Sequence, residues 1–443
     1  MKASALKYFI ISLLASLISV IIVLMPFHAF LTVWGSSLVG HYTVLRLWKE
    51  FLLAVAAVGA LYLLLMDIKV RTQTLTRRLL WLIAAYLAWL LVRSLIALAH
   101  HSVTHKALAY GDLVDSRFLL FFLIAWMVAV RTKQLPAQWQ RLLLWPAFGV
   151  IGFALLQFFF LPHNFLSHFG YVDGKTIPPI ETINHNNNYI RVASTLRGAN
   201  PLGAYLILPI SLLTVYVLTP LKRNRSHIVV LPLALAALFC SFSRSAWIGA
   251  FLAMAVIVTI RLKHLVSQKL FALTGVAFVL LIGVAFALHD SASFQNVVLH
   301  TESHSAVKTT SNHGHAAALE SGVKDLWHEP FGEGPGTAGP ASVYDNGHVR
   351  LAEDFYLQLG QEAGWVAIGL FILINVGVGY LLWTRRADPL ALSLFAALIG
   401  LSVVNLLAHA WADDTLAYVW WGLAGIAMAQ PAMTEKQLKK HHA

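Results

Sequence analysis

The chain has 443 residues, of which 58% are hydrophobic and only 12% are charged, and its mean hydropathy is +0.70. Soluble domains carry about 25% charged residues. The composition therefore excludes a water-soluble enzyme, a disordered protein and, with one cysteine, a secreted module held together by disulfides. What remains is a protein that crosses a membrane several times.

Apolar segments recur along the chain at lengths that suit helices crossing a hydrocarbon core, which takes about 20 residues. In chain order, we predict transmembrane helices at 8–29, 50–67, 79–99, 117–131, 141–161, 201–219, 228–242, 244–261, 269–288, 363–383, 389–409 and 415–430. Some segments are short or nearly touch, so eleven or thirteen helices remain alternatives. The predicted fold is an all-α polytopic membrane protein of about twelve transmembrane helices with a large periplasmic loop region.

The placement of lysine and arginine predicts that both chain ends lie in the cytoplasm. With this orientation, short cytoplasmic loops and tails hold 20 of the 32 basic residues. We divide the chain into 1–288, with nine transmembrane helices and the outer loop 162–200, the large outer loop 289–362, and 363–443, with three helices and a cytoplasmic tail. Because the long loops face outward, we expect the active site to face the periplasm.

The net charge of +12 is then a signal of topology and a source of attraction to membrane lipids. No nucleic-acid-binding motif accompanies it, so we expect no nucleic-acid partner. Histidines cluster in the large outer loop, where their irregular spacing is typical of a solvated loop. His313 and His315 form an HxH pair without an evident third ligand, and we predict no metal site.

The first informative segment, residues 191–203, reads RVASTLRGANPLG. Asn200 followed by proline predicts the N-cap and first residue of the sixth transmembrane helix. That helix begins outside, so its positive N-terminus faces outward, and Arg191 and Arg197 precede it. Such an arrangement favours an anion, with phosphate the natural ligand. The alternative is that both arginines hold lipid head groups at the membrane boundary.

A second segment, SFSRSAW at 241–247, separates two apolar spans at the outer face. A charge between two such spans is costly unless it faces a polar cavity or a partner, which makes Arg244 a candidate for function. The alternative is an arginine that only reaches the membrane interface. Arg93, which we expect to be the only charged residue inside a span, lies near its outer end and could reach water in the same way.

A third segment joins a glycine-rich stretch, 330–340, to a patterned run after it. The glycines indicate sharp turns or close approach of a ligand. Apolar residues then recur every four positions, at Leu351, Phe355 and Leu359, and polar residues lie on the opposite side, at Glu353, Tyr356 and Gln361. This spacing predicts an amphipathic helix. Its polar face either contributes to a site or only meets water.

Together these segments resemble the O-antigen ligase and polymerase superfamily. The resemblance rests on STLRGANPLGAYL, FSRSAW, FGEGPGTAGPAS and AEDFYLQLGQEAGWVAIGL, in this order. It implies a GT-C-like glycosyltransferase of the bacterial inner membrane that takes a glycan from undecaprenyl pyrophosphate without a cofactor or metal. Ligases in this family pass the glycan to lipid A-core oligosaccharide, and polymerases pass it to another lipid-linked glycan or exopolysaccharide chain.

The resemblance also implies roles for individual residues. Periplasmic arginines bind the donor pyrophosphate, here Arg191, Arg197 and Arg244, and a base in the late outer loop activates the acceptor hydroxyl. The family pattern is a histidine, a small polar residue, nine residues and GxxG; counting back from Gly364 puts Glu353 at the histidine position. The catalytic base is therefore either Glu353 or His348. Supporting residues are Asn200, Asp354, Tyr356 and Gln358.

This departure from the histidine of the ligase pattern leaves polymerase as the alternative to ligase. Direct displacement would invert the anomeric centre. A transporter of lipid-linked or small polar substrates is the leading alternative from another class, but transporters usually carry internal repeats and ionisable residues at mid-membrane depth. The sequence has no convincing repeat, and 17 of its 20 acidic residues lie in predicted outward positions, which favours chemistry at the outer surface.

Overall fold

The computed structural model describes residues 2–184, 186–219, 225–262, 291, 295–299, 311–345 and 349–429. These residues form helices almost throughout, with one two-stranded antiparallel sheet among them. Seven of the helical segments are long and apolar enough to cross a membrane: Ala5–Val39, Trp48–Met66, Arg78–His100, Gln134–Phe159, Ala199–Val217, Arg244–Arg261 and Phe355–Trp383. The predicted all-α polytopic membrane fold is confirmed, whereas the count of about twelve spans stays a prediction.

The first part of the chain contains α1 (Lys2–Leu24), η1 (Met25–Phe27), α2 (His28–Val39), α3 (Tyr42–Arg46), α4 (Trp48–Met66), α5 (Ile68–Leu75), α6 (Arg78–His100), α7 (His105–Ala129) and α8 (Gln134–Phe159). It continues with η2 (Phe165–Phe169), β1 (Glu181–Ile183), β2 (Asn186–Arg191), α9 (Ala199–Val217), α10 (Arg225–Cys240) and α11 (Arg244–Arg261). The last part contains η4 (Gln295–Leu299), α14 (Ser311–His328), η5 (Gly339–Tyr344), α15 (Phe355–Trp383), α16 (Pro389–Val404), η6 (Ala410–Ala412) and α17 (Asp414–Ala429).

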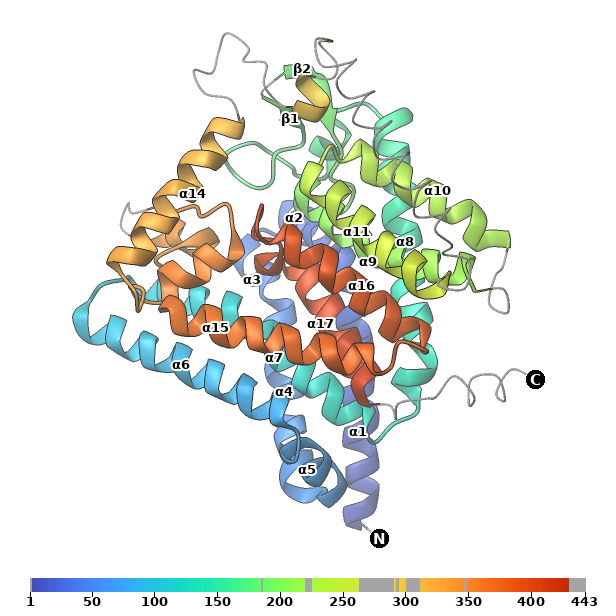
Figure 1. Ribbon diagram of the computed structural model, residues 1–443, viewed down its shortest axis with the longest axis vertical. Coiled ribbons are helices and arrows are strands. Elements are labelled where there is room, and N and C mark those ends of the chain that lie inside the picture. The colour runs from blue at the N-terminus through green and yellow to red at the C-terminus, as the bar shows by residue number, and fades with distance from the viewer. Residues whose placement is uncertain are drawn as a thin grey trace.

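The core of the protein is built around α9 and α17, which are buried along nearly their whole length. A helix that is apolar on all sides is stable only when other elements surround it. α17 packs against α7, and α9 packs against α10, α11 and α16. In Figure 1, α15 and α6 run side by side along one flank, and the β1–β2 hairpin lies at the end of the molecule opposite the N-terminus.

The predicted spans coincide with helices except for 269–288, which lies outside the described residues. Several boundaries nevertheless differ from the prediction, and two of them have the same cause. The span predicted from residue 117 belongs to α7, which begins at His105, so Arg117 lies in the middle of the helix. The span predicted from residue 363 begins at Phe355. In both cases charged side chains within the helix resemble a span boundary in the sequence.

Two helix starts also differ from the sequence prediction. α9 begins at Ala199 with Gly198 as N-cap, two residues before the predicted cap at Asn200. The amphipathic helix expected from Leu351 begins only at Phe355, because the Asp354 side chain accepts a hydrogen bond from the Leu357 amide, at 2.8 Å, and caps the helix there. Glu353 therefore precedes α15 instead of lying on it.

The glycine-rich stretch packs tightly against the protein's own helices. Gly336 has φ +91°, and a Cβ atom there would lie 2.3 Å from the Ala107 carbonyl oxygen in α7. Its amide donates to Glu362 Oε1 in α15 at 2.8 Å. The Arg93 guanidinium in α6 donates to the Gly332 carbonyl. The sequence predicts either sharp turns or close approach of a ligand at these glycines. In the structure they form sharp turns that pack closely against α6, α7 and α15.

Candidate functional site

Two of the three informative segments of the sequence meet at the β1–β2 hairpin. In the hairpin, Glu181 of β1 lies opposite Arg191 of β2. The Val192 amide donates to the Cys240 carbonyl at 3.2 Å, which docks the end of β2 onto the turn between α10 and α11. This turn continues directly into Arg244, the first residue of α11. The fold therefore joins two arginine-bearing segments that lie about fifty residues apart in the sequence.

Arg191 is fixed between these segments by two hydrogen bonds. Its Nε donates to the Ser241 carbonyl at 3.1 Å, and its Nη2 donates to Asn200 Oδ1 at 2.5 Å. Burial lowers the pKa of the Arg191 guanidinium, and the Glu181 carboxylate opposes this effect. Arg244 lies within electrostatic range of Arg191. Two guanidinium groups held this close favour an anion beside them.

A cavity of about 240 Å³ opens beside this cluster. Three predicted site residues line it: Arg197, Asn200 and Glu353. Ser245 of α11 and two residues from the connection between α16 and α17, His409 and Asp413, also line it. We call it the outer cavity, after the outward orientation that the sequence predicts for this end of the molecule. It brings a cation, an imidazole and the three carboxylates of Glu181, Glu353 and Asp413 together from four separate parts of the chain.

The buried Asn405 side chain shapes the connection that carries His409 and Asp413. Asn405 Oδ1 accepts a hydrogen bond from the Trp411 amide at 3.0 Å, and the Asn405 carbonyl accepts one from the Phe355 amide at 3.0 Å. His409 Nδ1 lies 3.2 Å from the Ala352 carbonyl oxygen. These contacts fix the α16–α17 connection against the start of α15, so that His409 and Glu353 line the same cavity.

Arg197 and Asp413 form an ion pair in the lining of the outer cavity, with 3.5 Å between Arg197 Nε and Asp413 Oδ2. The Asp413 carboxylate also caps α17 by accepting from the amides of Thr415 and Leu416. Burial raises the pKa of Asp413, and the Arg197 charge opposes this. Arg197 remains 39% exposed and is therefore accessible to a ligand in the cavity.

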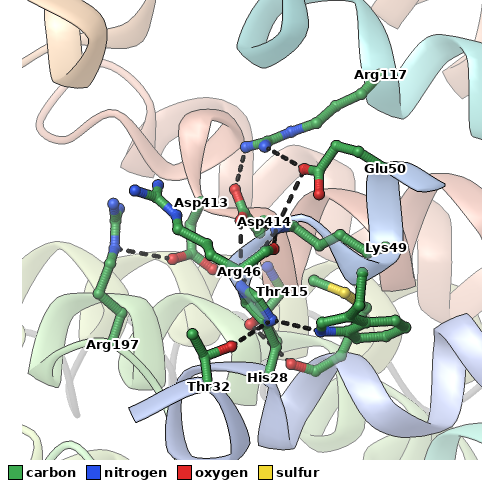
Figure 2. A network of polar contacts seen from close by, with 12 residues as sticks. His28, Thr32, Arg46, Lys49, Glu50, Arg117, Arg197, Asp413, Asp414 and Thr415 are labelled. Carbon is green, nitrogen blue, oxygen red and sulfur yellow. Dashed lines mark hydrogen bonds and ion pairs between the residues drawn. The ribbon is translucent and has the colours of Figure 1, made fainter. Parts of the chain in front are cut away.

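A buried network of charges continues from Asp413 into the interior through its neighbour Asp414, as Figure 2 shows. The Asp414 carboxylate pairs with Arg117 of α7 and, at 2.9 Å, with Lys49 Nζ of α4. Arg117 and Lys49 also pair with Glu50, at 3.2 and 3.1 Å. Arg117 Nη2 further donates to the Ala412 carbonyl at 3.2 Å. The network thus anchors the η6–α17 segment to α4 and α7.

His28 also belongs to this network. It accepts a hydrogen bond from Trp48 Nε1 at 2.9 Å and lies 3.6 Å from Asp414. Lys49 and Arg117 are each 1% exposed. The expectation that Arg93 is the only charged residue inside a span is therefore wrong. Buried charges persist only when they are paired, and the partners of Asp414 all come from distant parts of the sequence.

The N-terminus of α9, predicted to bind an anion, already carries one of the protein's own carboxylates. The Ala199 amide donates to Glu181 Oε2 at 3.1 Å. A Cβ atom at Gly198 would lie 2.6 Å from Glu181 Oε1, so the glycine makes this approach possible. A ligand anion at the outer cavity is consequently expected to bind through side-chain cations, above all Arg197, instead of through this amide.

The remaining predicted residues have partners in the surrounding fold. Asp354 caps α15, and burial raises the pKa of its carboxyl group while the hydrogen bond from Leu357 opposes this. Gln358 is buried against Gly339 of the glycine-rich stretch, and the Tyr356 ring lies 6.3 Å from the Phe371 ring. These three residues support the segment around Glu353. His348, the alternative base, lies outside the described residues.

Sequence reasoning missed His409, Asp413 and the charge network. The signal was present as AHAWADD at 408–414, a run with one histidine and two aspartates in a very short connection between two apolar helices.

A comparison with known families supports the resemblance for part of the chain. Residues 228–372 match a family model described as O-antigen ligase. This segment contains Arg244, the glycine-rich stretch and Glu353, whereas Arg191, Arg197 and the α16–α17 connection lie outside it. No curated protein matches the chain.

Proposed function

Because residues 228–372 match the O-antigen ligase family model, we propose that the chain is a member of the O-antigen ligase and polymerase superfamily. In this proposal it transfers a glycan from undecaprenyl pyrophosphate to lipid A-core oligosaccharide. The observation that carries this proposal is the meeting of Arg197, Glu353 and His409 in one outer cavity. An anion-binding cation and basic side chains are what transfer from a pyrophosphate carrier to a sugar hydroxyl requires.

In the proposed reaction, Arg197 binds the donor pyrophosphate at the cavity, with Arg191 and Arg244 adding positive charge beside it. The acceptor hydroxyl loses its proton to a base and its oxygen attacks the anomeric carbon. The bond between that carbon and the pyrophosphate oxygen breaks on the opposite side, so the configuration inverts. The arginines stabilise the negative charge that develops on the leaving lipid pyrophosphate.

Glu353 is the first candidate for the base because its side chain lines the outer cavity. His409 is a second candidate that the family pattern does not contain. The Ala352 carbonyl can only accept a hydrogen bond, so His409 Nδ1 carries the proton and Nε2 is the basic nitrogen of the neutral ring. His348 stays a third candidate on sequence grounds.

The proposed location is the bacterial inner membrane, with both chain ends in the cytoplasm and the outer cavity facing the periplasm. The distribution of basic residues supports this orientation, since most of them lie in short loops predicted on the same side of the membrane as the N-terminus. The hairpin and the outer cavity would then lie where lipid-linked glycans are displayed for transfer.

The test is a transfer assay with purified protein, a polyprenyl-pyrophosphate glycan and lipid A core. Glycan attached to the core, with and without a metal chelator, is the result expected of a metal-independent ligase. A lengthening ladder of lipid-linked glycan would instead make the protein a polymerase with the same donor. Absence of transfer to either acceptor, together with substrate-dependent flux in proteoliposomes, would overturn the enzyme proposal in favour of a transporter.

A further inference from the structure

A second, larger cavity of about 750 Å³ lies at the opposite end of the molecule from the hairpin. Its walls come from α5, the turn between α7 and α8, the turn between α15 and α16, and the end of α17. In Figure 1 these elements lie toward the end that carries the N-terminus. We call it the basal cavity, and nothing in the proposed transfer reaction uses it.

The lining of the basal cavity is strongly basic. Its charged members in the described part of the chain are all cations: Lys69, Arg77, Arg131, Lys133 and Arg385. Hydroxyl and amide side chains lie between them, from Thr72, Gln73 and Thr76. Cations and neutral donors gathered around one hollow are the chemistry that binds phosphate groups.

One nearby carboxylate, Asp67, is shared between two cations and so compensates only part of this charge. Asp67 Oδ2 lies 2.8 Å from Arg131 Nε and 2.7 Å from Lys7 Nζ. Its other oxygen accepts hydrogen bonds from the amides of Lys69 and Val70 at the start of α5. Asp67 therefore orients Arg131 and the first turn of α5 at the edge of the cavity.

Arg385 is positioned rigidly at the wall of the basal cavity. It is 8% exposed, and its guanidinium donates to the carbonyl oxygens of Leu381, at 2.9 Å, and Met428, at 3.4 Å. Burial lowers the pKa of the Arg385 guanidinium, and the nearby charge of Arg77 lowers it further. Two like charges held together in this way are stabilised by an anion that contacts both.

The cavity also has an apolar wall formed by Trp126, Ala129, Val130 and Met428. A soluble phosphate ion has no apolar atoms to pack against this wall, whereas the glycerol and upper acyl carbons of a lipid can pack against it. The number of basic residues favours a head group with two phosphates over one with a single phosphate. Basic hollows between transmembrane helices on the cytoplasmic side are the usual place for such lipids.

We propose that the basal cavity binds the head group of an anionic phospholipid, preferentially one that carries two phosphodiesters. Arg77 and Arg385 contact one phosphate, and Arg131 and Lys133 contact the other, while the acyl chains leave along the apolar wall. The bound lipid thus ties α5 and α6 to the ends of α15 and α17, two helices whose opposite ends begin beside the outer cavity, next to Glu353 and Asp413.

The test measures lipid binding to the purified full chain in detergent by native mass spectrometry. Diphosphatidylglycerol, phosphatidylglycerol and phosphatidylcholine serve as probes, with inorganic phosphate as a soluble competitor. The expected order of affinity is that of the head-group charge, diphosphatidylglycerol being the tightest. Equal affinity for phosphatidylcholine, or complete displacement of lipid by millimolar inorganic phosphate, would overturn the proposal.

Variants locate the binding. Removing one cation should lower the affinity for diphosphatidylglycerol about fivefold. The double variant with Arg77→Gln and Arg385→Gln should therefore bind this lipid more than about tenfold more weakly than wild type. Arg386→Gln is the matched control, because Arg386 carries the same charge one residue later, donates to the Trp383 carbonyl and is exposed. If the variant at the buried Arg385 does not fold, Lys133→Glu at an exposed position replaces it as the test of binding in the basal cavity. Equal binding by the control and cavity variants would place the lipid elsewhere.

Discussion

Arg117, in the middle of α7, forms a buried ion pair with Asp414, the first residue of α17. The neighbouring Asp413 pairs with Arg197 at the outer cavity. One short segment therefore joins the charge network of the interior to the candidate site. Because the network fixes the segment that carries His409 and Asp413, changes in buried residues are expected to reach the site through it.

Arg117→Ala should strongly destabilise the protein. The substitution leaves the Asp414 carboxylate buried with one cation fewer, which costs about 3–5 kcal/mol. The measurement is the melting temperature of the purified protein. Replacing both charges, with Arg117→Met and Asp414→Leu, should recover much of the loss, and an Arg117→Ala melting temperature equal to that of wild type would contradict the role assigned to the network.

Gly336→Ala should disrupt the packing of the glycine-rich stretch. Its new Cβ atom would lie 2.3 Å from the Ala107 carbonyl oxygen, and φ is +91°. Left-handed backbone and overpacking together cost about 2–5 kcal/mol. The matched control is Gly314→Ala in α14, where no atom lies within 4 Å of the new Cβ position. Similar thermal stability for the two variants would show that the stretch is not packed as described.

The Glu329–Arg350 pair should make stability depend on pH. Burial raises the pKa of Glu329, but the hydrogen bond and charge of Arg350, 3.0 Å away, outweigh this and hold the pKa below its usual value. A lowered carboxyl pKa gives stability that is present above the unfolded pKa and is lost as pH falls through the folded pKa.

Glu329→Gln should therefore lower the melting temperature slightly at pH 7, by a free energy of at most about 1 kcal/mol because the pair is partly exposed. As the pH falls below the usual carboxyl range and through the lowered pKa of Glu329, the difference from wild type should shrink, since Glu329 of the wild type then becomes protonated. A difference that grows as the pH falls would contradict this assignment. Lys324→Gln, at the exposed pair with Glu320, controls for loss of a surface charge.

The base should be identified by comparing Glu353→Gln, His409→Gln and His348→Ala in the transfer assay. Loss of a general base lowers the catalytic rate about 10²- to 10⁴-fold. We expect this loss for Glu353→Gln, with KM for the donor nearly unchanged because the arginines bind the pyrophosphate. His409→Gln should have a smaller effect if His409 only positions the Ala352–Glu353 segment. The reverse order of losses would make His409 the base.

The sequence predicts the fold class and part of the site because both rest on local patterns. Apolar length predicts the helices, and the clustering of Arg197 and Asn200 around the start of α9 identifies one wall of the outer cavity. The sequence did not predict the start of α7, because Arg117 resembles a boundary until its partner Asp414, about 300 residues later, is known. His409 and Asp413 were missed for the same reason: their position depends on how Asn405 folds the α16–α17 connection.

The most direct test of the central claim is glycan transfer by purified wild type and Arg197→Ala. Arg197 contacts Asp413 at the rim and is partly exposed, so the variant should fold, with a melting temperature close to that of the control Lys175→Ala. We predict that Arg197→Ala lowers kcat/KM for the polyprenyl-pyrophosphate donor about 10²- to 10³-fold, since the substitution removes one of the cations that stabilise the leaving pyrophosphate. Transfer by folded Arg197→Ala at the wild-type rate would show that the outer cavity is not the site of the reaction.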